Sequence, residues 1–215
     1  MFGKVTMLVS ALLLAATAQA APIVLDFEGI GDITPVGNFY NGGAGKNYGV
    51  SFSSATFALV DADAGGGGNF ANEQSPNTIM YVEDIGDGFL NFAAGFDTGF
   101  SFFYTSSTMD AGVSVYDNVD GTGNLLASLD LTPQFTNNCN GDPSGTFCNW
   151  TAVGVGFNGI AKSIYFGGSA GQIGFDDITL GSVTAGDVGN VPEPASLLLS
   201  GAALLALLAT RRRKL

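Results

Sequence analysis

Short runs of β-branched and aromatic residues recur along the middle of this 215-residue chain. Glycine, asparagine, aspartate and serine separate the runs, and no stretch between residues 21 and 185 has a helical period. The pattern predicts ten or eleven strands, at residues 23–27, 49–53, 56–60, 78–82, 89–94, 99–104, 112–117, 125–131, 150–157, 161–166 and 172–180. Strands at this spacing predict an all-β domain over residues 21–183, an antiparallel jelly-roll-like β-sandwich.

Side chains within the runs alternate as they do in strands with one buried face. In the run 99–104, Phe100, Phe102 and Tyr104 share one face, and Ser101 lies on the other. Residues 118–124 contain two glycines, as is typical of a hairpin connection. The glycine-rich segments 42–49 and 61–77 are predicted to be loops, where binding residues usually lie.

The predicted domain is strongly acidic. Between residues 21 and 190 the only basic residues are Lys46 and Lys162, against 18 acidic ones, which gives a net charge of −16. Such a surface repels phosphate backbones, so nucleic acid is excluded as a partner. The chain has no histidine, which excludes the Ser-His-Asp and Cys-His catalytic arrangements. Its 17 phenylalanines and six tyrosines indicate a folded rather than a disordered acidic chain.

The first twenty residues have the pattern of a secretory signal peptide. Lys4 precedes an apolar stretch, and Ala18 and Ala20 form an A-x-A cleavage site. The stretch is too short to span a bilayer. We therefore predict an exported chain that begins at Ala21 after cleavage.

A second hydrophobic segment lies at the other end of the chain, after a polar linker predicted at residues 184–190. Residues 195–210 are apolar on every face and would form a helix about 24 Å long, whereas the hydrocarbon core of a bilayer is about 30 Å thick. The basic residues that follow predict a stop-transfer signal that stays in the cytoplasm; they are Arg211, Arg212, Arg213 and Lys214. A single hydrophobic helix is thus predicted, either a permanent anchor or part of a processing signal.

The segment 191–215 resembles the PEP-CTERM sorting domain of exported Gram-negative bacterial proteins, found where exopolysaccharide is made. The resemblance rests on a polar linker, Pro192-Glu193-Pro194, one short hydrophobic helix and a terminal basic cluster, in that order. It implies that an exosortase, a membrane cysteine protease, recognises Pro192, Glu193 and Pro194 and removes the helix. The basic cluster would hold the chain in the inner membrane until then.

The two cysteines, Cys139 and Cys148, are the first and last residues of a ten-residue segment. An exported chain meets an oxidising compartment, so a local disulfide is predicted, and two free thiols are the alternative. Closing this loop would stabilise the fold by roughly 2.5–3 kcal/mol.

Four acidic residues form the candidate metal site: Asp26, Glu28, Asp176 and Asp177. They lie in LDFEG and GFDDITL, which resemble the first and last strands of carbohydrate-binding and galactose-binding jelly rolls. That resemblance implies adjacent strands and a structural Ca²⁺, which takes six to eight oxygen ligands. Alternatively, the carboxylates are solvated or accept backbone hydrogen bonds. Because Asp176 and Asp177 point in opposite directions along a regular strand, only one of them is needed as a ligand.

These observations favour a non-enzymatic protein of the cell surface or extracellular matrix, associated with exopolysaccharide or biofilm. Trp150, Tyr40, Tyr48 and Tyr81 are candidates for stacking on sugar rings, and burial in the core is the alternative. Two other hypotheses stay open. One is a secreted carbohydrate-active enzyme with a pair of catalytic carboxylates. The other is a periplasmic binding module that its C-terminal helix anchors permanently.

Overall fold

The computed structural model describes residues 20–84, 86–135 and 146–189. All strands belong to one compact unit, Pro22–Gly189. A second unit combines the two ends of the chain, most of which lies outside the described residues. Across the described ranges, the structure contains no helix long and apolar enough to cross a membrane.

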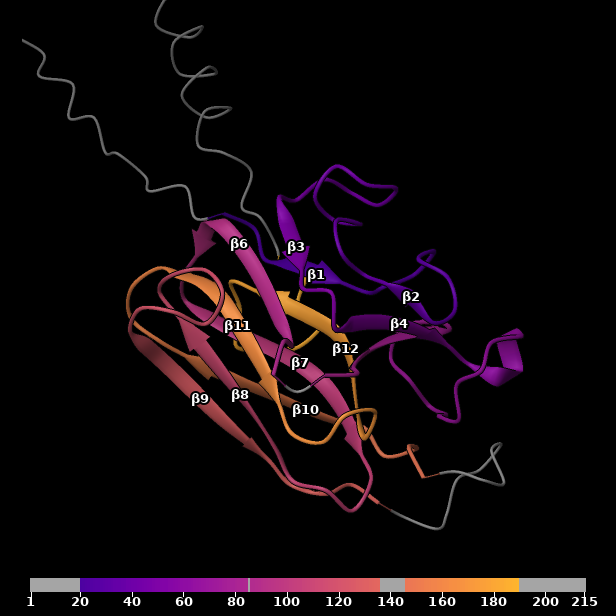
Figure 1. The fold of residues 1–215 in the computed structure, drawn as a ribbon. Helices are drawn as coiled ribbons and strands as arrows, with labels where there is room; N and C mark the ends of the chain where they lie inside the picture. The colour runs from indigo at the N-terminus through magenta and orange to yellow at the C-terminus, as the bar shows by residue number, and fades with distance from the viewer. Residues whose placement is uncertain (1–19, 85, 136–145, 190–215) are drawn as a thin grey trace, which may run out of the picture. The chain divides into compact units, whose positions relative to one another are not determined.

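Two antiparallel sheets lie face to face, which confirms the predicted β-sandwich (Figure 1). The larger sheet has seven strands, in the order β10-β7-β12-β5-β4-β2, and β1 pairs with β12. Its strands are β1 (Ile23–Leu25), β2 (Thr34–Pro35), β4 (Thr56–Val60), β5 (Thr78–Val82), β7 (Gly99–Ser106), β10 (Thr151–Gly156) and β12 (Ile173–Leu180). The smaller sheet has the order β3-β6-β11-β8-β9. Its strands are β3 (Val50–Phe52), β6 (Phe89–Phe96), β8 (Ala111–Tyr116), β9 (Leu125–Leu131) and β11 (Ala161–Gly167).

The predicted strands all appear, with ends that differ by up to two residues. The additional strand is β2, whose two residues include a proline, so its sequence has no alternation to detect. The predicted hairpin over residues 118–124 joins β8 and β9, which pair antiparallel. The predicted loop at residues 61–77 also contains a short 3₁₀ helix, η1 (Ala62–Ala64).

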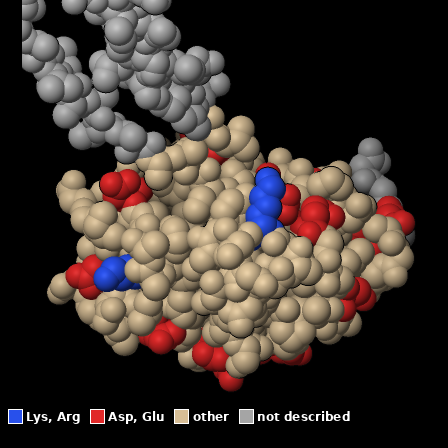
Figure 2. Space-filling view, turned by 90° about the horizontal axis from the view of Figure 1, so that it is seen from above, with Lys and Arg blue, Asp and Glu red and all other residues tan. Residues whose placement is uncertain are grey.

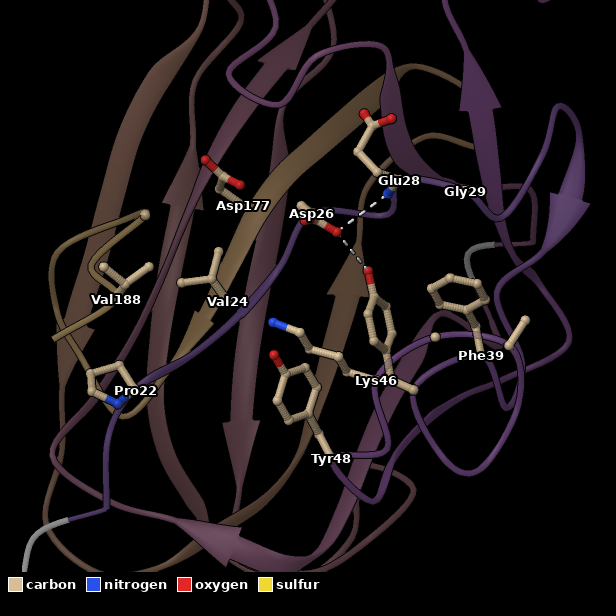
Figure 3. A pocket seen from close by; sticks show the side chains of 14 residues that line it. Pro22, Val24, Asp26, Glu28, Gly29, Phe39, Lys46, Tyr48, Asp177 and Val188 are labelled. Carbon is tan, nitrogen blue, oxygen red and sulfur yellow. Dashed lines mark hydrogen bonds between the residues drawn. The ribbon is translucent and has the colours of Figure 1, made fainter. Parts of the chain in front are cut away.

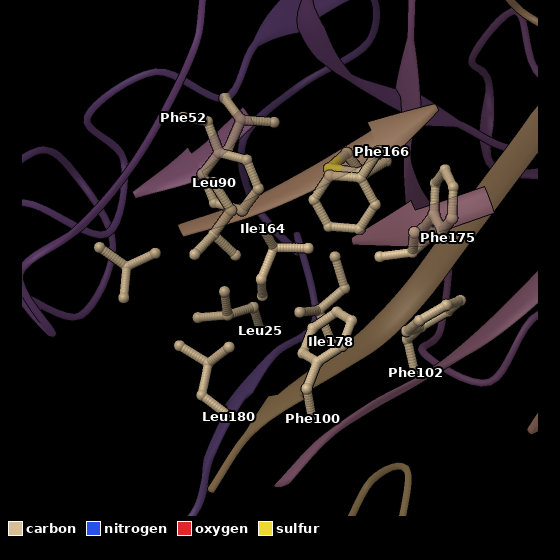
Figure 4. Close-up of a cluster of buried hydrophobic side chains, with 14 of the residues drawn as sticks. Leu25, Phe52, Leu90, Phe100, Phe102, Ile164, Phe166, Phe175, Ile178 and Leu180 are labelled. Atoms are coloured by element: carbon tan, nitrogen blue, oxygen red, sulfur yellow. The ribbon is translucent and has the colours of Figure 1, made fainter. Parts of the chain in front are cut away.

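Aromatic and aliphatic side chains from both sheets form the core (Figure 4). Phe166 of β11 meets Phe175 of β12 with ring centroids 4.9 Å apart, and it meets Phe100 of β7 at 6.3 Å. Phe100, Phe102 and Tyr104 are all buried on one face of β7, as their alternation predicts. Burial of this apolar surface is the main source of the fold's stability.

The chain after β12 packs back onto the larger sheet. Ser101 on the outer face of β7 donates its hydroxyl proton to the carbonyl of Ser182 at 2.9 Å. A Cβ atom at Gly154 would lie 2.1 Å from the carbonyl oxygen of Val183, so only glycine leaves room there. Further along, the amide of Gly186 donates to Oγ1 of Thr179 at 3.0 Å. We call residues 182–189 the C-terminal strap; it includes the described part of the segment predicted to be a linker.

Candidate functional site

An open pocket of about 760 Å³ lies where the first strand meets the last (Figure 3). Its walls come from β1 and the turn after it, the loop at residues 39–48, Asp177 of β12 and the C-terminal strap. The lining residues are Pro22, Val24, Asp26, Glu28, Gly29, Phe39, Tyr40, Ala44, Gly45, Lys46, Tyr48, Asp177, Gly186 and Val188. Three of the four residues predicted to bind calcium therefore line one pocket.

The pairing of β1 with β12 explains why these residues meet. Ile23 lies opposite Leu180 and Leu25 opposite Ile178, so the ends of the domain run side by side. Phe27, between Asp26 and Glu28, is fully buried and adopts a left-handed backbone conformation with φ 60°. A non-glycine residue in this conformation is strained, and such strain is often found at functional sites.

Tyr40 holds this turn from inside the fold. Its hydroxyl accepts a hydrogen bond from the amide of Phe27 at 2.7 Å and donates to Oδ1 of Asp26 at 3.4 Å. Burial, followed by the negative charge of Asp26, raises the pKa of Tyr40. Because Tyr40 is buried and its hydroxyl is engaged, its role is structural support rather than sugar stacking.

Glu28 and Asp176 each tie down the loop that precedes β5. Oε1 of Glu28 accepts hydrogen bonds from the amides of Asn77 and Thr78, both at 2.8 Å. Asp176 is fully buried, and its Oδ2 accepts from the amides of Gln74 at 3.0 Å and Ser75 at 2.7 Å. Both carboxylates thus accept backbone hydrogen bonds, the alternative role considered from the sequence.

Asp177 points into the pocket because β12 has a bulge. The register between β12 and β7 shifts between Asp176 and Thr179, and Asp177 has φ 47°. Phe175 and Ile178 are both in the core although they are three positions apart, so the strict alternation assumed from the sequence does not hold here. Burial, followed by the charge of Asp26, raises the pKa of Asp177.

The glycine-rich loop supplies the opposite wall. The amide of Tyr48 donates to the carbonyl of Tyr40 at 2.9 Å, and the two rings stack with centroids 6.2 Å apart. A Cβ atom at Gly45 would lie 2.3 Å from the ring of Phe39, so glycine allows the loop to close over that ring. Lys46 and half-buried Tyr48 then line the pocket together. The sequence predicts this segment to be a loop suited to binding and names Tyr48 as a candidate for sugar stacking, but it does not identify Phe39 or Lys46 as site residues.

The other candidate aromatic residues lie elsewhere. The indole nitrogen of Trp150 donates to the carbonyl of Ala71 at 3.0 Å. Tyr81 of β5 lines a second, mostly apolar hollow of about 220 Å³ on the larger sheet. Only Tyr48 among the four candidates therefore offers a half-exposed ring to the main pocket.

The calcium prediction lacks geometric support in the described part of the chain. There, no group of three or more acidic or cysteine side chains lies close enough to hold a metal ion. Calcium binding therefore stays a prediction, which thermal melts with Ca²⁺ and with a chelator would test.

Several predicted site residues cannot be placed. Ala18, Cys139, the Pro192-Glu193-Pro194 motif and the basic cluster from Arg211 to Lys214 lie outside the described residues. Ala20 is described and exposed, and Cys148 is buried. The disulfide and the cleavage site stay predictions.

The fold and the pocket define an all-β sandwich domain with one ligand-sized site at the end where its termini meet. The family model of the PEP-CTERM protein-sorting motif matches residues 190–214, which confirms the resemblance drawn from the sequence. The chain thus carries a PEP-CTERM sorting motif, which implies an exported protein that an exosortase processes at the membrane on its way to the cell surface.

Two solved structures match part of the chain. The carbohydrate-binding module CBM6cm-2 of Cellvibrio mixtus lichenase 5A, in complex with cellotriose, is 14% identical. The match covers 60% of this chain and 88% of that one, with a TM-score of 0.36. The CBM22-1–GH10 modules of Clostridium thermocellum xylanase 10B, complexed with xylohexaose, are 15% identical; the match covers 62% of this chain and 26% of that one, with a TM-score of 0.33. At these TM-scores neither similarity supports an argument about a ligand. No curated protein matches the chain.

Proposed function

We propose that the chain is a non-enzymatic protein of the cell surface or extracellular matrix whose sandwich domain binds exopolysaccharide in the main pocket. The sorting motif supports the location, because it implies export and processing by an exosortase. Association with exopolysaccharide would place the mature protein in the biofilm matrix.

The observation that carries the glycan proposal is the mixed lining of the pocket. The rings of Tyr48 and Phe39 line the same pocket as Asp26, Asp177 and Lys46, and the pocket is open to solvent. A pyranose ring has an apolar C–H face that packs on an aromatic ring, and hydroxyl groups that bind carboxylates and ammonium groups. A pocket with apolar walls and a few polar groups is typical of small-ligand sites.

Retention on polysaccharide tests the proposal. The full-length chain, purified in mild detergent, should be retarded in gels that contain matrix polysaccharide, and Tyr48→Ala should weaken the binding about tenfold, or ~1.4 kcal/mol. Tyr116→Ala is the matched control, because Tyr116 is a half-exposed tyrosine of β8 outside the pocket. Unchanged retention of Tyr48→Ala would exclude this pocket as the polysaccharide-binding site. If the wild-type protein were not retained, glycan binding itself would be excluded.

A glycosidase is the second candidate, favoured by one observation. Burial, followed by the charge of Asp26, raises the pKa of Asp177 in the same pocket, and glycoside hydrolysis usually needs one carboxyl group of raised pKa beside a second carboxylate. An enzyme would release new reducing ends from the bound polysaccharide, and Asp177→Asn would abolish their release. Binding without new reducing ends supports the non-enzymatic proposal.

A further inference from the structure

The main pocket contains a carboxylate that no group among the described residues neutralises. Asp177 is half-buried, and none of the hydrogen bonds among the described residues ends on its side-chain oxygens. Asp26 lies in the same pocket; its Oδ1 binds Tyr40 and the amide of Glu28, while its Oδ2 accepts no hydrogen bond from the described residues. The pocket thus offers acceptor oxygens on two carboxylates.

Lys46 does not supply the missing positive charge. It is exposed and makes no ion pair within the described part of the chain. Glu28 also lines the pocket, but its carboxylate binds the amides of Asn77 and Thr78, so the carboxylates of Asp26 and Asp177 are left with one ammonium group there. Acidic side chains are spread over the face shown in Figure 2, and basic side chains are few there and have acidic side chains next to them. With a net charge of −16 over residues 21–190, an acidic ligand would be repelled.

A ligand ammonium group would compensate for this imbalance. A partly buried carboxylate without a counter-charge is costly, and a charge-assisted N–H···O bond is roughly twice as strong as a neutral one. The same ligand must also fit the apolar side chains of the pocket, which are Phe39 and Tyr48 on the loop side and Pro22 and Val188 on the opposite side (Figure 3). A ring with an apolar face and an amino substituent meets both requirements, whereas a metal ion does not.

We infer that the main pocket selects glycans with free amino groups, such as a de-N-acetylated hexosamine polymer, whose ammonium group binds Asp177 and Asp26. The inference rests on the proposed function and adds the class of sugar. Tyr48 contributes to the binding of any glycan, and Asp177 distinguishes the amino-bearing one.

Three oligosaccharides with the same β-1,4 backbone test the inference, because they differ at carbon 2. Chitosan hexamer has an amine there, chitin hexamer an acetamide and cellohexaose a hydroxyl group. Calorimetry with the full-length chain in mild detergent, below the pKa of the sugar amine, should give chitosan hexamer an affinity at least about tenfold above the other two. The preference should shrink as salt is added, because salt screens charge pairs.

Asp177→Asn should reduce this preference to about threefold or less. Asparagine tolerates the left-handed conformation of residue 177, so the variant is expected to fold. Asp130→Asn, which changes an exposed aspartate of β9, should leave the preference unchanged. Tyr48→Ala should weaken all three ligands together.

The outcomes separate the inference from the proposed function. Equal binding of all three hexamers would overturn amine selection and leave glycan binding intact. Binding of poly-L-lysine as tight as that of chitosan hexamer would show that charge alone is recognised, and would overturn selection of a sugar. No binding of any hexamer or matrix polysaccharide would overturn both.

Discussion

At the residue scale, Asp176 makes the stability of the domain depend on pH. Burial raises its pKa to about 7 from the ordinary 3.8, although hydrogen bonds from Ser75 and Asp177 lower it. At a pH between these two pKa values, the Asp176 side chain keeps its proton in the folded state and has released it in the unfolded chain. The free energy of unfolding should therefore fall as pH rises from about 4 to 7, by roughly 3–5 kcal/mol from this residue.

Urea denaturation at several pH values measures this dependence. Burial also raises the pKa values of Asp177 and Glu73, so these two residues change the free energy of unfolding with pH in the same direction. A variant is therefore needed to separate the contribution of Asp176 from theirs. Asp176→Asn removes the titrating group, and its profile should be flatter than that of the wild type. Parallel profiles for the two proteins would contradict the assignment.

The hydroxyl of Tyr40 supports the strained turn at Phe27. Tyr40→Phe would leave the amide of buried Phe27 without its acceptor, and a buried unsatisfied donor costs about 1–3 kcal/mol. Tyr116→Phe, at a half-exposed position, should change the free energy of unfolding by less than about 0.5 kcal/mol. Equal effects of the two substitutions in urea denaturation would mean that the hydrogen bond contributes nothing.

At the element scale, β7 follows the alternation predicted from the sequence, whereas β12 departs from it. Alternation in β7 correctly identifies its core face, because Phe100, Phe102 and Tyr104 all belong to the core, although Ser101 on the other face is also buried. The same rule fails at Asp177, because a bulge depends on the neighbouring strand and leaves no local signal. The sequence predicts that Asp26, Glu28 and Asp177 belong to one site, and β1 and β12, which carry or adjoin them, do pair. The sequence does not predict Lys46 and Phe39 in this site, because they reach the pocket through the packing of a loop.

The C-terminal strap depends on the absence of a side chain in β10. Gly154→Ala would push a methyl group against the carbonyl of Val183 and displace the strap, which should lower the free energy of unfolding by about 1–3 kcal/mol. It should also weaken glycan binding, because Gly186 and Val188 line the pocket. Gly156→Ala, in the same strand, makes only ordinary contacts and serves as the control. A stable Gly154→Ala protein with wild-type binding would contradict the strap's role in the pocket.

At the scale of the whole molecule, the two processing signals lie close in sequence to residues that line the pocket. Pro22 and Val188 line the pocket, and the predicted signal cleavage site and the matched sorting motif lie within two residues of them. Both processing steps therefore occur close to the pocket in sequence. Cleavage upstream of Pro22 and downstream of Val188 would leave the pocket lining complete in the mature protein.

Mass spectrometry of the mature C-terminus decides between release and permanent anchoring. In cells that make an exosortase, the surface form should lack Arg211, Arg212, Arg213 and Lys214, because the protease would remove the tail that carries them. Replacing Pro192, Glu193 and Pro194 by alanine should leave the full tail in place and the protein in the membrane fraction. Alanine substitution of Ser196, Ser200 and Thr210 is the matched control, because it changes three tail positions outside the Pro-Glu-Pro motif. A wild-type surface protein that still ends in Leu215 would instead establish the permanent anchor, with the sandwich held at the membrane.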